Sequence, residues 1–294
     1  MFFNKITDSI KDRPHKESKR GNRLKISVIS GKKILCLGIV LLISICTFVG
    51  FSEKQDKTIQ ANAGVVNNKK IAWGLKRGEG ESQPTLGTAN MEVLNKYEGI
   101  AMGNPDEKVV YLTFDEGYEN GYTAQMLDVL KENDVKAAFF ITGGFLNNNS
   151  DLVQRMVDEG HTVGNHTVNH YSMPDIDDET LKSEIMDLHS AVFEKTGYEM
   201  KYVRPPKGEY SDRTVGISKS LGYTTVLWSF AYDDWNRGKQ GRLDYAKTKI
   251  LENLHNGEVI LLHAVSSDNA SVLDECIKQI KSKGYVFKTL DEFN

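Results

Sequence analysis

The sequence predicts an α/β protein organised around a largely parallel β-sheet. Strand-like and helix-like segments alternate through residues 107–294, which is the order that βα units produce. The strand-like runs are apolar almost throughout, as at 109–114 and 137–142, so both faces of the sheet are expected to be covered. Polar residues follow several of these runs, where α/β proteins place their sites. About six or seven such units suit a barrel or an open doubly wound sheet.

The individual elements follow from apolar periodicity and from the residues that interrupt it. Strands are expected at 109–114, 137–142, 161–163, 202–204, 224–230, 259–264 and from 286 onward. Helices, with apolar residues three and four positions apart, are expected at 122–133, 152–159, 179–195, 243–254 and 272–281. Gly197 ends the longest helix. Pro205 and Pro206 stop the short strand before them, because proline cannot continue a ladder.

The first part of the chain predicts a membrane anchor. Residues 34–51 form an uncharged apolar run of about 18 residues, just long enough as a helix to cross the hydrocarbon core. Residues 1–33 are basic, so the positive-inside rule makes them a cytoplasmic arm and places the chain after residue 51 outside. The alternative is a signal peptide cleaved after Ala63, which would release a secreted form. Both interpretations place the body of the protein outside the cytoplasm.

The remaining chain divides into three parts by composition. Residues 52–70 are polar and aperiodic, which indicates a flexible linker. Residues 71–106 lack clear periodicity and are expected to pack on the following domain, 107–294, as an irregular segment. The net charge is −3, and the chain after the basic arm is acidic, which argues against a nucleic acid partner. Cys276 is the only cysteine after the apolar run, so the body has no internal disulfide.

Carboxylates and histidines follow the first predicted strands. Asp115 and Glu116 come directly after the strand at 109–114, where two carboxylates need a compensating cation unless they form a solvated turn. His166 and His170 are four residues apart and can face the same way, and neutral imidazoles suit zinc and similar metals. A single histidine is more often structural, but this group favours a metal site.

Three further clusters end other predicted strands. Arg204 could clamp a carboxylate with its planar guanidinium group, or could simply be a surface charge. Asp234 lies in the fourth cluster, beside Trp235. His263 ends an apolar strand, where a general acid or base would lie, although a buried core histidine is the alternative. Together the five clusters suggest a metal hydrolase, because two histidines and one carboxylate leave an open position for water.

At these clusters the sequence resembles the polysaccharide deacetylases with a NodB homology domain, carbohydrate esterase family 4. The five family motifs occur in order as TFDEG (113–117), HTVNH (166–170), RPPKG (204–208), DDW (233–235) and LLH (261–263). A closer resemblance, which includes residues 73–104, is to the delta-lactam-biosynthetic de-N-acetylases of the PdaA type. The resemblance implies that residues 107–294 fold as a distorted (β/α) barrel.

The resemblance also implies roles in acid–base catalysis. Asp115 would be the catalytic base that takes a proton from metal-bound water, and Arg204 would hold it. His263 would be the general acid that protonates the departing amine, and Asp234 would orient and tune it. The backbone N–H of Lys207 would help the metal to stabilise the tetrahedral oxyanion.

The same resemblance implies a divalent metal held by Glu116, His166 and His170. Zinc is favoured, and cobalt, manganese or magnesium are alternatives. Glu116 departs from the family, which has aspartate there, and from the PdaA subgroup, which often has asparagine. The longer side chain would either ligate from further back or leave the two histidines with a more weakly bound metal.

The candidate contacts to a sugar are Lys207, Tyr210, Trp235 and Tyr118. Lys207 stands where many family members carry an aromatic residue, so the surroundings of the sugar are expected to differ. For each aromatic residue, plain core packing is the alternative.

The resemblance implies de-N-acetylation of N-acetylmuramic acid in peptidoglycan strands whose peptide has been removed. The product would cyclise to the muramic-δ-lactam of the spore cortex, and the enzyme would depend on a peptide-stripping amidase. The anchor at 34–51 would hold the enzyme on the lipid membrane, beside its cell-wall substrate. The alternatives are a deacetylase of N-acetylglucosamine in peptidoglycan or chitin-like glycans, and a glycan-binding module without activity.

Overall fold

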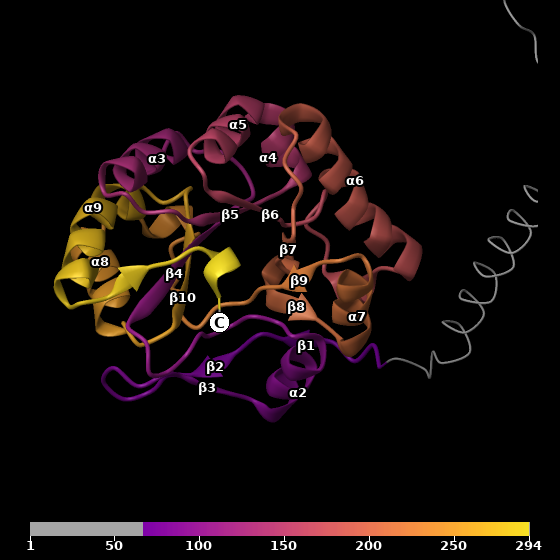
Figure 1. The fold of residues 1–294 in the computed structure, drawn as a ribbon, viewed down its shortest axis with the longest axis horizontal. Coiled ribbons are helices and arrows are strands. Elements are labelled where there is room, and N and C mark those ends of the chain that lie inside the picture. Colours follow the sequence, from indigo (N-terminus) through magenta and orange to yellow (C-terminus); the bar gives the residue numbers. More distant parts are fainter. Residues whose placement is uncertain (1–66, 294) are drawn as a thin grey trace, which may run out of the picture. The chain divides into compact units, whose positions relative to one another are not determined.

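The structure, a computed structural model, describes residues 67–293, and its centre is a parallel sheet. The strand order is β10-β4-β5-β6-β7-β9, with β11 beside the start of β4 (Figure 1). These strands are β4 Val109–Glu116, β5 Ala138–Ile141, β6 Thr162–Asn165, β7 Tyr202–Val203, β9 Thr224–Thr225, β10 Glu258–His263 and β11 Val286–Phe287. Every pairing among them is parallel, so the predicted α/β class is confirmed.

The sheet curls, and the segment after β9 leads back toward β10. Val226 forms an isolated bridge with Ile100, and Phe230 forms one with Ile260 of β10. The prediction of a continuous strand at 224–230 is wrong, because the backbone changes its hydrogen-bonding partner along this stretch. The result is a curled parallel half-barrel, which agrees with the expected distorted barrel.

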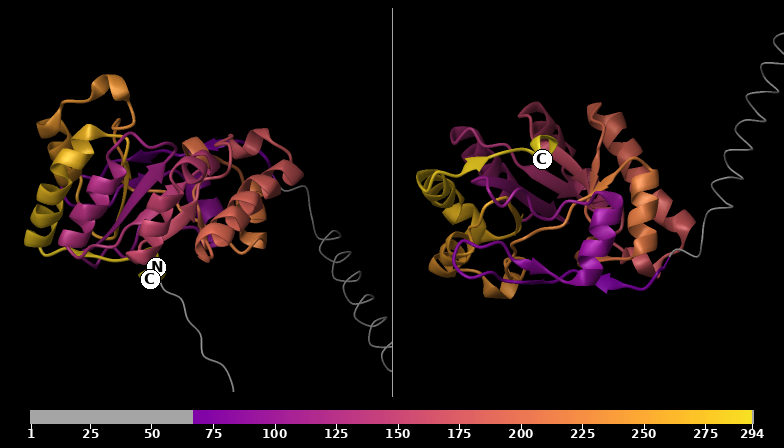
Figure 2. Two further views of the ribbon diagram at one scale, coloured as in Figure 1. Left: turned by 90° about the horizontal axis from the view of Figure 1, so that it is seen from above. Right: turned by 60° about the horizontal axis from the view of Figure 1, so that its bottom comes forward.

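Helices cover the outside of the curled sheet. They are α2 Thr88–Tyr97, α3 Thr123–Glu132, α4 Gly143–Asn148, α5 Ser150–Asp158, α6 Asp178–Thr196, α7 Asp212–Ser220, α8 Leu243–Glu252 and α9 Ser267–Ser282. Short 3₁₀ turns occur at η1 Met173–Asp175, η2 Pro206–Gly208, η3 Arg237–Lys239 and η4 Leu290–Glu292. Figures 1 and 2 show α3 to α9 around the sheet, with the segment that contains α2 running along the remaining side.

The segment before β4 is more regular than expected. It contains α2 and two short pairings, β1 Ile71–Ala72 with β8 Glu209–Tyr210 and β2 Leu75–Lys76 with β3 Thr85–Leu86. The N–H of Trp73 donates to the carbonyl of Gly208 over 2.8 Å, which ties the segment to the turn after β7.

Three other helices differ from expectation. Helices α4 and α7 lie in stretches where no helix was predicted. Helix α7 is capped by Ser211, the residue before its first, whose side chain forms a reciprocal capping box with Thr214. Helix α9 begins five residues before its expected start because the Ser266 side chain accepts a hydrogen bond from the Asn269 N–H.

Side chains of β4 alternate between two apolar cores. Leu112 and Phe114 pack in the larger core between sheet and helices, and Tyr111 packs in the smaller core inside the curl. Because successive side chains of a strand point to opposite faces, Asp115 lies on the inner face and Glu116 on the helix-covered face. This alternation decides which of the two carboxylates reaches the site.

Within residues 67–293, no helix is long and apolar enough to cross a membrane. The anchor predicted at 34–51 and the basic arm at 1–33 lie outside the described residues, as do Ala63 and nearly all of the expected linker.

Candidate active site

A cavity of about 590 Å³ opens at the carboxyl end of the parallel strands. It brings together seven of the residues that the sequence singled out. Those residues are Asp115, Tyr118, His166, His170, Lys207, Trp235 and His263. The remaining wall is formed by Gly117, Gly208, Trp228, Ala231, Tyr232, Leu261 and Val265, of which sequence reasoning had missed Trp228.

Asp115 is buried at the end of β4 and is paired with a cation. Arg204 Nη1 donates to Asp115 Oδ1 over 2.8 Å, and His166 Nε2 lies 3.4 Å from Asp115 Oδ2. Burial by itself raises the pKa of Asp115, but the neighbouring His166, Arg204 and His263 outweigh it, so that pKa is lowered. Asp115 is therefore ionised at neutral pH, as a general base must be.

Arg204 is fully buried and held from several sides. It follows Val203, the last residue of β7, so it leaves the sheet at the edge where the cavity opens. Its Nη2 donates to Thr113 Oγ1 at 2.9 Å, and its Nε donates to the carbonyl of Val226 at 3.2 Å. The Phe140 ring centre lies 4.1 Å from the guanidinium carbon. These contacts fix the plane that Arg204 presents to Asp115.

The two histidines of the HTVNH motif converge on one point. His166 Nδ1 donates to the carbonyl of Arg204 over 2.8 Å, which leaves its Nε2 free to face the cavity. His170 Nε2 lies 3.2 Å from His166 Nε2. Burial lowers the pKa of His166. Burial and the neighbouring His166 lower the pKa of His170 to about 4. Both imidazoles are therefore neutral at pH 7, which is the form that binds metals.

The two Nε2 atoms have the spacing of a pair of ligands to one divalent metal. Two nitrogen ligands at zinc distances in a tetrahedral site lie about 3.4 Å apart, close to the separation of the two Nε2 atoms. Asp115 Oδ2 is the neighbouring carboxylate oxygen. In residues 67–293 no cluster of three or more His, Cys, Asp or Glu side chains is arranged to hold a metal. A divalent metal would be held by His166 and His170, and such an open site would leave positions for water.

The loop between the two histidines is held by Glu184 of α6, which sequence reasoning did not single out. Glu184 is 5% exposed. Its carboxylate accepts hydrogen bonds from the backbone N–H of Asn169 at 2.7 Å and from its side-chain amide at 2.6 Å. The loop needs this support because Thr167 and His170 have φ values of 65° and 58°, in a region that non-glycine residues rarely adopt.

His263 ends β10 and is held by Asp234. The two residues are joined twice, because His263 Nδ1 lies 2.9 Å from Asp234 Oδ1 and the His263 N–H donates to Asp234 Oδ2 at 2.7 Å. The Asn269 side chain, which sequence reasoning missed, donates to Asp234 Oδ2 at 2.6 Å. Burial lowers the pKa of His263, but Asp234 outweighs burial and raises it. His263 therefore favours its protonated form, as a general acid should.

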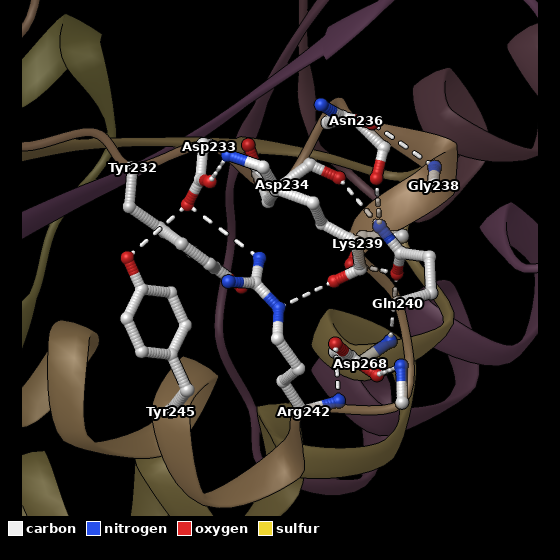
Figure 3. A network of polar contacts seen from close by, with 12 residues as sticks. Tyr232, Asp233, Asp234, Asn236, Gly238, Lys239, Gln240, Arg242, Tyr245 and Asp268 are labelled. Atoms are coloured by element: carbon white, nitrogen blue, oxygen red, sulfur yellow. Dashed lines mark hydrogen bonds and ion pairs between the residues drawn. The ribbon is translucent and has the colours of Figure 1, made fainter.

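The loop that carries Asp234 is tied to the start of α9 by a polar network (Figure 3). Gln240 Nε2 donates to the carbonyl of Asp234 over 2.9 Å. The carboxylate of Asp268, in the first turn of α9, accepts hydrogen bonds from the N–H groups of Gly241 and Arg242 at 2.7 and 2.9 Å. The network gives Asp234 a fixed position relative to the strand that ends at His263.

Glu116 does not join the histidines, which corrects its expected place as a metal ligand. It is fully buried, is absent from the cavity wall and lies on the opposite face of β4 from Asp115. Burial first, and then the nearby Glu119 and Asp115, raise its pKa well above the usual range. Neither carboxyl oxygen has a hydrogen-bonding partner among the described residues. Glu116 is therefore a neutral acid behind the site.

Tyr210 also lies away from the cavity, which corrects its expected contact with a sugar. It is fully buried, and its hydroxyl donates to Asn90 Oδ1 over 2.7 Å. Tyr118 and Trp235, by contrast, line the cavity and are 43% and 60% exposed. Exposed aromatic faces beside a cavity suit stacking on the apolar faces of sugar rings.

Comparisons with known proteins identify the family of this chain. Residues 102–226 match the polysaccharide deacetylase family. The chain is 44% identical over 254 residues to an uncharacterized 30.6 kDa protein of Geobacillus stearothermophilus, covering 86% of this chain and 93% of that protein. It is 40% identical over 233 residues to the Bacillus subtilis peptidoglycan-N-acetylmuramic acid deacetylase PdaA, covering 79% and 89%. It is 35% identical over 193 residues to a Bacillus cereus peptidoglycan-N-acetylglucosamine deacetylase, covering 64% and 88%.

The solved structure of Bacillus subtilis PdaA, described as a family 4 carbohydrate esterase, has the same fold. It matches this chain with a TM-score of 0.76 at 40% identity, covering 78% of this chain and 98% of that one. The fold and the site thus define a hydrolase that acts on amide bonds of acetylated polysaccharides. The chain belongs to the polysaccharide deacetylases, carbohydrate esterase family 4.

Proposed function

We propose that the protein removes the N-acetyl group from N-acetylmuramic acid in peptidoglycan whose peptide has been stripped. The observation that carries the deacetylase chemistry is that one cavity holds both Asp115, whose pKa is lowered, and His263, whose pKa is raised. The choice of muramic acid is supported by the similarity to PdaA, whose name gives that sugar. The product would cyclise to the muramic-δ-lactam of the spore cortex.

The reaction would be a hydrolysis with Asp115 and His263 at its two ends. A metal held by His166 and His170, zinc first among the candidates, would acidify water and polarise the acetyl carbonyl. Asp115 would accept the water proton as the C–O bond forms.

The second half of the reaction would use the other side of the cavity. The Lys207 N–H would donate to the oxyanion, provided the carbonyl oxygen lies within hydrogen-bonding reach. His263 would then give its proton to the sugar nitrogen as the C–N bond breaks, releasing acetate and a free amine.

The test is acetate release by the full-length protein from peptidoglycan pretreated with a peptide-stripping amidase. Untreated peptidoglycan and chitooligosaccharide are assayed in parallel, with and without chelator and with each candidate metal restored. Release from the stripped glycan alone, lost with chelator, is the expected result. Release from chitooligosaccharide instead would favour the N-acetylglucosamine alternative, which the Bacillus cereus relative supports. No release from any glycan would favour a binding module.

We also infer that the enzyme works at the outer surface of the cell membrane, after an amidase that strips the peptide. The apolar run at 34–51 and the basic residues before it support the location. The dependence on an amidase follows from the proposed substrate. Fractionation of cells that express the full chain, with protease added from outside, tests the location.

A further inference from the structure

The substrate proposed above carries a charge that N-acetylglucosamine lacks. Removing the peptide from muramic acid leaves the 3-O-lactyl group with a free carboxylate, whereas an intact peptide leaves an amide there. The lactyl ether and the acetamido group stand on neighbouring ring carbons. A receptor for the carboxylate must therefore lie within a few ångströms of the reacting amide, in the same cavity.

Lys207 is the one lysine or arginine in the wall of that cavity. Its side chain is exposed, and among residues 67–293 it has no ion-pair or side-chain hydrogen-bonding partner. Two acidic groups close to this turn, Asp175 and Glu209, are already paired with Lys70. The ammonium group of Lys207 is therefore free to bind an anion that enters the cavity.

The backbone holds Lys207 in one orientation. It has φ 61° between Pro206, whose ring fixes its own φ, and Gly208 at φ 65°. A Cβ on Gly208 would lie 2.9 Å from side-chain atoms of both Trp73 and Trp228, so this turn packs tightly against the segment before β4. The turn therefore fixes the backbone of Lys207 at the wall of the cavity.

Lys207 also lies close to the reacting groups. It lines the same cavity as His166 and His170. An ammonium group on this wall therefore borders the space next to the pair of histidines where the acetamido group would bind. A carboxylate on the neighbouring ring carbon would meet the same charge.

We infer that the Lys207 ammonium group pairs with the lactyl carboxylate and selects peptide-free muramic acid over N-acetylglucosamine; this inference rests on the proposed function. The expected selectivity is about two- to fivefold, because a pair on a solvent-exposed lysine is partly screened.

The test uses the full-length protein and two forms of one substrate. Amidase-stripped glycan is assayed as the free lactyl carboxylate and after conversion of that carboxylate to its methylamide. For the wild type, amidation should lower kcat/KM about two- to fivefold. Lys207→Met should lower kcat/KM about two- to fivefold on the free carboxylate and make the enzyme indifferent to amidation, whereas Lys207→Arg should keep the preference.

The outcomes separate the inference from the proposed function. A wild type that deacetylates both forms equally overturns the inference alone, as does a Lys207→Met variant that loses the same factor on both forms. A wild type that releases acetate from chitooligosaccharide but not from either stripped glycan overturns the proposed function and the inference with it. Thermal unfolding of each variant checks that the turn still folds.

Discussion

His263 lies directly opposite Asp115 in the parallel pairing of β10 with β4. Register partners on neighbouring parallel strands point to the same face of a sheet, so the two side chains enter the cavity side by side. Each then meets a different partner, Arg204 for Asp115 and Asp234 for His263. The sheet register thus brings the two groups together, and the partners move their pKa values in opposite directions.

Replacing Asp115 with asparagine should lower kcat at least ~10²-fold, because asparagine cannot accept the proton of the attacking water. Glycan affinity should be kept. The change also leaves the buried Arg204 without its anion, so the free energy of unfolding should fall by about 3–5 kcal/mol. Acetate release, glycan binding and urea unfolding measure the three effects.

The matched control for that variant is Asp128→Asn, which breaks an exposed pair with Arg155. An exposed pair contributes about 0–1 kcal/mol, so this variant should keep both activity and stability. Unchanged turnover in Asp115→Asn would exclude Asp115 as the base.

Replacing Asp234 with asparagine should move the alkaline limb of the pH–rate profile to lower pH. His263 must be protonated to act as the acid, and Asp234 is the main group that raises its pKa; Asp115 raises it and Arg204 lowers it. Without the Asp234 charge, His263 loses its proton at a lower pH, so activity declines earlier as pH rises. The measurement is log kcat/KM against pH for wild type and variant.

Asp233→Asn is the control, because the neighbouring Asp233 is paired with Lys239 and has no contact with His263. Its alkaline limb should match that of the wild type. A limb that stays in place in Asp234→Asn would mean that another group donates the proton.

Much of the site could be predicted from the sequence because its polar residues directly follow apolar strands. Asp115, Arg204 and His263 each lie within one residue of the carboxyl end of a buried strand, so they meet at one edge of the sheet whatever the details of the loops. The family motifs then gave each residue a role that the hydrogen bonds support. The missed Glu184 and Asn269 act through tertiary contacts, which spacing alone does not reveal.

One signal for Glu184 was present in the sequence. It lies between Leu181, Ile185 and Leu188 on the buried face of α6, where a charged residue needs a partner.

The prediction that Glu116 is a metal ligand failed for a different reason. The strand was expected to end at 114 but continues for two more residues, and each added residue changes the face to which its side chain points.

Replacing Glu184 with glutamine should weaken metal binding about 10–100-fold, the usual effect of losing support behind a ligand. Glutamine replaces one of the two accepting oxygens with an NH2 donor, so the hydrogen bonds from the backbone N–H and the side chain of Asn169 cannot both be kept in their present geometry. The loop that carries His170 would then sample other conformations. Isothermal titration calorimetry with zinc measures the affinity. Zinc-dependent activity is a second readout.

Asp187→Asn is the control on the same helix, because Asp187 is exposed and has no contact with the loop. It should bind metal as the wild type does. Equal affinities for Glu184→Gln and Asp187→Asn would show that the loop holds its conformation without Glu184.

Replacing Glu116 with glutamine should leave metal affinity within about twofold of the wild type, because the side chain lies across β4 from the histidines. His166→Gln, which removes a predicted ligand, is the comparison and should lose most of the affinity.

Glu116→Gln should also change how stability depends on pH. In the wild type the folded protein keeps the Glu116 proton, whereas the unfolded chain releases it above its ordinary pKa of about 4.3.

The wild type should therefore lose stability as pH rises from about 4.3 toward the raised pKa of folded Glu116, and Glu116→Gln should lack this loss. Urea unfolding at pH 5 and pH 8 measures the difference, and the variant should gain relative to the wild type at the higher pH. A loss of zinc affinity as large as that of His166→Gln would instead mean that Glu116 turns into the cavity and binds the metal. The two readouts distinguish a neutral acid behind the site from a ligand within it, since a ligand must be ionised and would favour the higher pH.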